Sequence, residues 1–323
     1  MKKCLLAISL ILGTVIGSGF STGKEVAVFF SRFGYYSFVF IPVCFVLFYF
    51  AFYLLMTKGR KRLGKGVGSK PILALMVVCC VVFSSSMYAG ISSCCEGIAW
   101  WITLVLFGCV FVLSFLACFK KLAFLSKINA ILMPVLLIIV LLFFIFVFPN
   151  SSLSELPEQR WGVNLFGGGF FCVLYFVLNI SLSSVVIADG GEGLTKKQIK
   201  LVSLLSAFIL SAFMFLINLL IICNYEVVTS QMPLLVLSHG VFFFLLRFVI
   251  LVGCLTTLLS DIYIASTSCK KLGFSDLRIL LVCVALPFAL SKIGFSSIVS
   301  WLYPSVSFLG AILLVLIFFR KPT

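Results

Sequence analysis

The sequence predicts an all-α polytopic membrane protein, and three observations support this. Hydrophobic residues make up 63% of the 323 residues and charged residues only 10%. The mean hydropathy is +1.30, which is outside the range of soluble globular domains. The apolar residues also fall in runs of about 20, which is the length that a helix needs to cross a bilayer.

Ten such runs, bounded by charges, proline or glycine, are predicted transmembrane helices. They are residues 4–30, 35–57, 71–93, 98–118, 125–148, 164–190, 199–223, 241–268, 277–292 and 296–319. The ninth run is the shortest. Because the loops between the runs are brief and none is of low complexity, we expect a single transmembrane domain over residues 1–323.

The positions of lysine and arginine orient the chain, because these residues accumulate on the cytoplasmic side of membranes. With the N-terminus inside, nineteen of the 24 basic residues fall in inner segments, and only Arg32, Arg160 and Lys292 fall in outer ones. We therefore expect both termini and the loop 58–70 in the cytoplasm, and the loop 150–160 outside. The net charge of +15 is explained by this bias, so no nucleic-acid partner is expected.

The first run contains a polar stretch from Gly13 to Glu25, with four glycines, several hydroxyl residues and two charges. A break exposed to lipid leaves N–H and C=O groups unsatisfied, at about several kcal/mol each. Secondary transporters place discontinuous helices where helix ends and freed carbonyls face a substrate and a coupling ion. We therefore predict a broken helix over 4–30 with a binding site at its centre and non-helical backbone over 15–20.

The sixth run, 164–190, is the second candidate for a broken helix. It has three consecutive glycines near its outer end and several polar residues at its middle, including Tyr175 and Asn179. We expect residues 175–179 to be non-helical and to face the first break. The two predicted breaks lie about half a chain apart, so each half holds five spans, and an odd number inverts the second half in the membrane. This predicts two inverted repeats, about 1–150 and about 160–323.

The eighth run carries Thr256 and Thr257 near its middle and Asp261 one turn further on. Threonines in membrane helices either bond back to carbonyls of their own helix or offer their hydroxyls to a ligand, and the sequence leaves both interpretations open. An aspartate inside a span is costly and indicates a functional role.

With the stretch from Gly13 to Glu25 and the five-plus-five plan, the chain resembles the amino acid–polyamine–organocation superfamily, and within it the YkvI-like bacterial membrane proteins. Further matching residues lie in both halves: Phe29-Phe30, Phe33-Gly34, Tyr175 to Asn179, Thr256-Thr257, Gly294-Phe295-Ser296 and Leu302-Tyr303-Pro304. The resemblance implies the inverted-repeat fold of sodium-coupled amino acid symporters, with discontinuous helices 1 and 6. It also implies a location in the bacterial cytoplasmic (inner) membrane.

The resemblance further implies two sites. The substrate site is formed by the backbone of one segment and by two side chains opposite it: Gly17, Ser18, Gly19, Tyr175 and Asn179. The sodium site is formed by three carbonyls and two hydroxyls: Gly13, Ile16, Gly253, Thr256 and Thr257. Apart from this coupling ion, no cofactor is expected. Asp261 is not part of the matching motif, which leaves proton coupling open.

Three other residues are candidates for gating or for closing the pocket. Tyr88 either closes the substrate pocket from the third span or packs between helices. Glu25 and Lys24 either gate the outer path or pair with each other at a wet helix end.

These features predict a secondary active transporter of a small amino acid or related amine, coupled to sodium, with alternating access around a midplane site. A proton-coupled transporter of the same fold is the nearest alternative. A channel or a non-transporting membrane scaffold is the alternative from a different class. An enzyme is not expected, because the sequence has one histidine and no paired carboxylates in a span. The substrate and the oligomeric state remain open.

Overall fold

The computed structural model describes residues 2–59, 70–119, 122–148 and 161–319. All regular secondary structure in these ranges is helical. The outer loop 150–160 and most of the inner loop 58–70 lie outside the described residues, as does the basic C-terminal end.

Eight helical stretches of the described residues are long and apolar enough to cross a membrane, and each corresponds to one of the ten predicted runs. The long helices are α4 (Ser37–Leu54), α6 (Lys70–Cys94), α7 (Trp100–Phe119), α8 (Leu122–Val147), α9 (Trp161–Gly190), α10 (Lys196–Cys223), α12 (Val241–Lys271) and α16 (Tyr303–Phe319). The protein is therefore a multi-pass helical membrane protein.

The other two predicted runs are divided into shorter pieces. The first run forms α1 (Lys2–Val15), α2 (Ser18–Ser21) and α3 (Lys24–Phe29). The ninth forms α13 (Asp276–Leu280), a π-helical turn η5 (Leu281–Ala285) and α14 (Leu286–Leu290). No single helix in either run reaches the length of a bilayer crossing. The count of ten spans and the inverted repeat therefore stay predictions.

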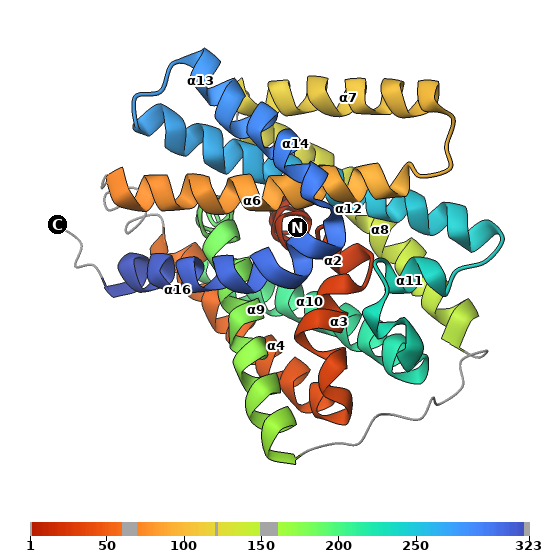
Figure 1. Cartoon of the computed structure of the whole chain (residues 1–323). Helices are drawn as coiled ribbons and strands as arrows, with labels where there is room; N and C mark the ends of the chain where they lie inside the picture. The colour runs from red at the N-terminus through yellow and green to blue at the C-terminus, as the bar shows by residue number, and fades with distance from the viewer. Residues whose placement is uncertain (1, 60–69, 120–121, 149–160, 320–323) are drawn as a thin grey trace.

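Helix α1 lies at the centre of the molecule, where Figure 1 shows it almost end-on beside the label N. It packs against α8, α9, α10 and α12, and its apolar residues Leu10, Ile11, Leu12 and Val15 are buried. A break at the end of this helix is therefore enclosed by protein, which is the setting that a break in a membrane helix requires.

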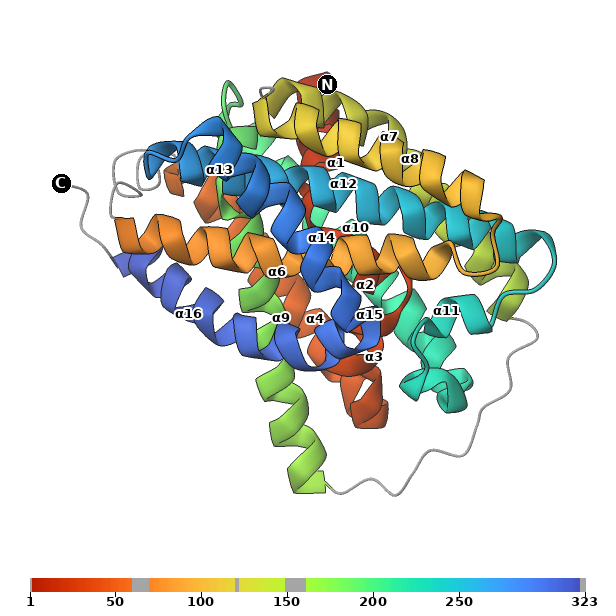
Figure 2. The same cartoon turned by 45° about the horizontal axis from the view of Figure 1, so that its top comes forward.

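The helices around α1 form a closed layer. Helix α12 packs along α6, and α14 crosses α6 on its outer side (Figure 2). Helix α16 packs against α9 and α6. The π-helical turns η5 and η7 (Ile298–Leu302) end two residues before Pro287 and Pro304. Because proline has no N–H to continue the hydrogen-bond ladder, a widened turn at these places is expected.

The break in the first run is narrower than the predicted 15–20. Helix α1 ends at Val15 and α2 begins at Ser18, so only Ile16 and Gly17 are outside helix. A second interruption follows at Gly23, which has a φ of 79°. That left-handed backbone conformation is strained for any residue with a Cβ, so the glycine is required at this second bend.

The predicted break in the sixth run is absent, because α9 is one continuous α-helix of 30 residues. Its polar side chains are satisfied by their own helix instead. The Asn179 side-chain amide donates to the Tyr175 carbonyl at 2.9 Å, and the Ser181 hydroxyl donates to the Leu178 carbonyl at 2.9 Å. The prediction of a discontinuous helix 6 over 175–179 is therefore wrong.

The glycines of α9 serve close packing rather than a break. A Cβ on Gly168 would lie 2.4 Å from Cε2 of Phe40 on α4, and one on Gly167 would lie 3.0 Å from a ring carbon of Phe33. Small residues of this kind let membrane helices approach each other closely. Glycine clusters in a membrane helix are thus compatible with either a break or a contact, and only the neighbouring helix distinguishes them.

This packing generates a test. We expect Gly168→Ala to lower the unfolding temperature of the purified protein in detergent, because the added methyl overlaps the Phe40 ring and overpacking costs about 1–3 kcal/mol. Gly169→Ala is the matched control, since its Cβ would meet Phe40 at an ordinary 3.5 Å. Equal unfolding temperatures for the two variants would contradict this account of the glycines.

Candidate functional site

The centre of the candidate site is the end of α1 against α12. The Thr257 hydroxyl lies 3.0 Å from the Ile16 carbonyl oxygen and 3.3 Å from the Gly13 carbonyl oxygen. The last carbonyls of a helix have no partner within that helix, so a hydroxyl from α12 satisfies groups that the break frees. Three of the five proposed ion ligands are therefore brought together.

The other two proposed ligands lie on α12 itself. The Thr256 hydroxyl donates to the Gly253 carbonyl at 3.1 Å. Thr256 therefore bonds back to its own helix, which is one of the two interpretations left open for the threonines. Thr257 bonds instead to carbonyls of the first run, and its role as an ion ligand stays a prediction. The sequence alone does not distinguish the two threonines, because they are neighbours in the chain. They differ only in which side of α12 they occupy.

Gly253 and Gly17 bring the two segments into contact. A Cβ on Gly253 would lie 2.9 Å from the Ser21 hydroxyl oxygen and 3.4 Å from the Gly17 carbonyl oxygen. A Cβ on Gly17 would lie 2.8 Å from the Met87 methyl carbon and 3.3 Å from the Thr257 hydroxyl oxygen. The break is therefore packed between α6 and α12, and neither Gly17 nor Gly253 has room for a side chain.

Asn129 on α8 belongs to the same region, and the sequence analysis missed it. Its side-chain amide nitrogen is buried without a hydrogen-bond partner in the described part of the chain. A Cβ on Gly13 would lie 2.4 Å from that nitrogen. The sequence contains one indication of this role: Asn129 is the single asparagine in the apolar run 125–148, where an unpartnered amide is costly.

Glu25 and Lys24 do not pair with each other. The Lys24 ammonium donates to the carbonyls of Thr229 and Ser230, at 3.1 and 2.8 Å. Glu25 turns the other way and lies over Gly19, where a Cβ on that glycine would be 2.3 Å from Oε1. The pairing alternative for these two residues is therefore wrong, and their roles are separate.

Lys24 joins the broken helix to the outer connection between α10 and α12. This connection contains η4 (Tyr225–Thr229) and α11 (Pro233–Val236). Next to the Lys24 contacts, the Leu234 amide donates to the Thr22 carbonyl at 3.0 Å. The segment 225–236 therefore attaches to the outer half of the first run through both backbone and side chain.

Tyr175 lies against α3, and the Asn179 side chain bonds back to its own helix. The Tyr175 ring is fully buried and packs against Phe29 and Phe30 of α3, with ring centroids 5.4 and 5.2 Å apart. Its third ring neighbour is Phe48 of α4. The sequence predicts Tyr175 opposite Gly17, Ser18 and Gly19, whereas its ring lies further along the first run, against Phe29 and Phe30.

Tyr303 is a second buried aromatic residue close to Glu25. Its ring stacks on Phe83 of α6, with centroids 4.2 Å apart, and its hydroxyl bonds to the Ser86 hydroxyl. Both Tyr303 and Tyr175 lie within electrostatic range of Glu25. The sequence analysis used Tyr303 only as part of the family likeness, because nothing local separates it from an ordinary core tyrosine.

Asp261 is buried on α12, with 1% of its surface exposed, and Oδ2 has no hydrogen-bond partner among the described residues. It lies within electrostatic range of Cys80 on α6 and of Tyr303. A buried carboxyl without a partner is costly when ionised, so this position favours proton uptake or a bound cation.

Tyr88 is placed away from the break. Its hydroxyl donates to the Ser114 hydroxyl on α7 at 3.1 Å, and its ring packs against Phe111 and Phe288. The neighbouring Met87 faces Gly17 instead. Tyr88 therefore packs between helices, which is one of the two interpretations of this residue.

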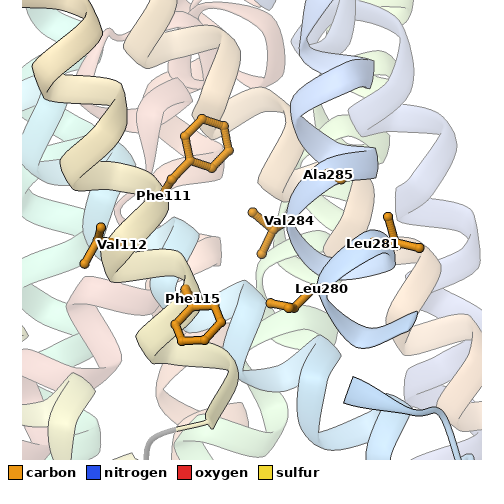
Figure 3. Close-up of a pocket in the computed structure, with 7 residues that line it drawn as sticks. All are labelled: Phe111, Val112, Phe115, Leu280, Leu281, Val284 and Ala285. Carbon is orange, nitrogen blue, oxygen red and sulfur yellow. The ribbon is translucent and has the colours of Figure 1, made fainter. Parts of the chain in front are cut away.

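A cavity of about 490 Å³ lies outside this centre, between α7 and the α13–η5 segment. Figure 3 shows its lining, which is entirely apolar: Phe111, Val112, Phe115, Leu280, Leu281, Val284 and Ala285. Such a surface on a membrane helix is of the kind that lipid chains cover. It contains none of the candidate site residues.

The Lys24 contacts generate a test. We expect Lys24→Met to lower the unfolding temperature in detergent, because two hydrogen bonds from a charged donor are lost and each contributes about 1.5–3 kcal/mol. Lys197→Met, on the exposed first turn of α10, is the control and is expected to leave the temperature unchanged. An unchanged temperature for Lys24→Met would contradict a structural role for the contact.

Comparison with known proteins yields a match in structure but none in sequence. No protein-family model matches the chain, and no curated protein does. A crystal structure of the Eremococcus coleocola manganese transporter, in complex with an aromatic bis-isothiourea substituted compound, is similar with a TM-score of 0.53 and 13% sequence identity. The similarity covers 97% of this chain and 76% of that chain. At this identity the comparison establishes the fold, so the chain has the fold of a membrane transporter.

Proposed function

We propose that the protein is a secondary active transporter of a small amino acid or related amine, coupled to sodium. The observation that carries the proposal is the enclosed break in the first run, with the carbonyls of Gly13 and Ile16 turned to a hydroxyl of α12. The transporter fold supports the same function class. The continuous α9 removes the second break, so the proposal depends on the first break alone.

The ion site follows from the type of oxygen at the break. Carbonyl and hydroxyl oxygens are neutral, hard ligands that suit a cation of low charge. A sodium ion at this place would take the carbonyls of Gly13 and Ile16 and the Thr257 hydroxyl, whose proton then turns away. Thr256 and Gly253 are proposed to complete the shell after the hydrogen bond between them opens.

The substrate site is proposed on the opposite side of the break, at the start of α2. The first N–H groups of a helix have no partner within the helix, and such groups bind carboxylates. The backbone amides of Ser18 and Gly19 would hold the substrate carboxylate in this way. Because α2 has four residues, individual N–H groups carry this interaction, and a helix dipole contributes little.

Alternating access would move the broken run relative to α6 and α12. Helix α2 is bounded by two bends, at Ile16–Gly17 on one side and at Gly23 on the other, and α3 follows the second bend. Such bends can absorb the rotation of a short segment between them. The outer connection 225–236 would move with α3, because Lys24 and Thr22 are bonded to it.

Proton coupling through Asp261 is the second candidate, and its burial without a partner favours it. A metal ion as cargo is a third, favoured only by the manganese transporter named in the comparison. Among the described residues, no group of three His, Cys, Asp or Glu side chains is placed to hold a metal ion. We therefore keep the amino acid or amine as the proposed substrate.

A channel and a membrane enzyme fit the geometry less well. Among the described residues, buried polar atoms without a partner are spread over α3, α8, α9, α10 and α12, and two of the cavities between the helices have wholly apolar linings, whereas a pore needs polar residues along its length. For an enzyme, a base and a nucleophile in contact would be required, and Glu25 and Asp261 come from different segments without such a pairing. Proteoliposome uptake separates all these classes, because only a coupled transporter accumulates substrate against a gradient.

The ion proposal predicts that Thr257→Ala raises the sodium concentration for half-maximal uptake by about 5- to 150-fold, as expected for one lost ligand of about 1–3 kcal/mol. Thr257→Ser keeps the hydroxyl and is expected to behave like the unaltered protein. Ser266→Ala is the matched control, because this hydroxyl on the same helix bonds to its own backbone at Tyr263. The measurement is labelled amino acid uptake at a series of sodium concentrations.

A separate prediction distinguishes the proton alternative. If protons drive uptake through Asp261, Asp261→Asn abolishes the pH dependence of uptake, while Thr257→Ala leaves it intact. If sodium drives uptake, the unaltered protein depends on the sodium gradient and Asp261→Asn preserves that dependence. Uptake that is indifferent to sodium would refute the ion site and leave the fold untouched.

A further inference from the structure

Glu25 is a buried carboxyl without a counter-ion. Only 2% of its surface is exposed, and Oε2 has no hydrogen-bond partner in the described ranges. The adjacent Lys24 is directed to the carbonyls of Thr229 and Ser230. No cation of the described residues lies close enough to offset the charge of Glu25.

When ionised, such a group requires a partner that the described residues do not supply. Burying an ionised carboxylate is costly unless a cation and further hydrogen bonds accompany it. A buried carboxyl of this kind beside the proposed transport path is a candidate ligand for a cation that enters along that path. The partner is expected to be a cation with N–H donors, because Oε2 accepts hydrogen bonds and cannot donate them when ionised.

The surroundings of Glu25 suit an organic ammonium group. Phe29 lies one turn after Glu25 on α3 and packs on Tyr175, so the Tyr175 ring flanks the same face of α3. Tyr303, which packs on Phe83 and bonds to the Ser86 hydroxyl, is also within electrostatic range of Glu25. Aromatic faces attract desolvated cations.

The place of Glu25 also matches the length of an α-amino acid. Its carboxyl lies directly over Gly19, and the amides of Ser18 and Gly19 are the proposed partners of the substrate carboxylate. The two groups of an α-amino acid are joined by a single carbon, so a carboxylate site and an ammonium site must be adjacent. Residues 18 to 25 provide both within one bent segment.

We propose that Glu25 binds the protonated amine of the transported substrate, with Tyr175 beside it, so that the substrate class is restricted to α-amino acids and small primary amines. This rests on the proposed transport function. The proposal also predicts that the 2-hydroxy acids, which carry a hydroxyl in place of the amine, are rejected. An uncharged hydroxyl leaves the buried carboxylate without a counter-ion. The proposal gives Glu25 a role in substrate selection in place of gating.

The test uses the full chain in proteoliposomes and a panel of labelled amino acids. For each amino acid that accumulates, two unlabelled competitors are compared: the 2-hydroxy acid, which lacks the ammonium group, and the amine that lacks the carboxylate. For leucine these are 2-hydroxyisocaproate and isoamylamine. We expect the hydroxy acid to compete at least about 100-fold more weakly than the amino acid, and the amine to compete measurably.

Glu25→Gln is then expected to remove most of this discrimination, by about 100-fold in the ratio of amino acid to hydroxy acid competition. Glu25→Asp keeps the charge and is expected to retain a preference for the amino acid. Asp261→Asn is the matched control, because it neutralises another buried carboxyl with an unpartnered oxygen. The proposal makes no statement about the rate of uptake by Asp261→Asn. Its ratio of amino acid to hydroxy acid competition is expected to match that of the unaltered protein.

The outcomes separate this inference from the function on which it rests. If the unaltered protein accumulates an amino acid and Glu25→Gln keeps the original ratio, the role of Glu25 is wrong and the transport function stands. If the unaltered protein accumulates no member of the panel, the transport function fails and the inference with it. Should Glu25→Gln not fold, thermal stabilisation of the unaltered protein by leucine and not by 2-hydroxyisocaproate supports the inference, and equal stabilisation overturns it.

Discussion

The structure depends on satisfying the backbone groups that are freed where the first run breaks inside the membrane. Carbonyls without partners in a bilayer cost about several kcal/mol each, so the break cannot exist apart from α12. The Thr257 hydroxyl meets the carbonyls of Gly13 and Ile16, and Gly253 lets α12 approach closely enough for that contact. The central position of α1, surrounded by four long helices, follows from the same need for enclosure.

Polar chemistry around the break is divided into two parts. On the α12 side it consists of neutral oxygens from carbonyls and hydroxyls. Along α2 and α3 it consists of the backbone amides of α2, the Glu25 carboxyl and the tyrosine rings. The break at Ile16–Gly17 joins the two parts, so an ion and a substrate bound as proposed would both contact the broken first run. Differential binding of two ligands to one movable element is what thermodynamic coupling requires.

A connection that belongs to the second half of the chain packs on the first run beside the site. Lys24 and Thr22 in the first run bond to residues 229, 230 and 234, which are far away in sequence. A lysine inside a predicted span thus has a structural explanation, since its ammonium reaches backbone carbonyls of this connection. The same contact leaves Glu25 without the neighbour that the sequence offered as its partner.

The sequence by itself determined the class of the protein, because apolar runs of bilayer length are a property of local composition. Eight of the ten runs correspond to helices long enough to span, and the narrow break at Ile16–Gly17 falls within the predicted 15–20. The sequence also selected Thr257, but it did not separate this residue from Thr256.

What only the tertiary structure decided is where each polar or small residue finds its partner. The glycines and serines of α9 have the composition of a broken helix, yet the helix is continuous, because Phe40 packs on Gly168 and the side chains bond to their own carbonyls. Asn129 and Tyr303 lie at the site only because helices far apart in sequence pack together. A side chain's partner in a membrane bundle is set by contacts between helices far apart in sequence, and local composition contains no record of those contacts.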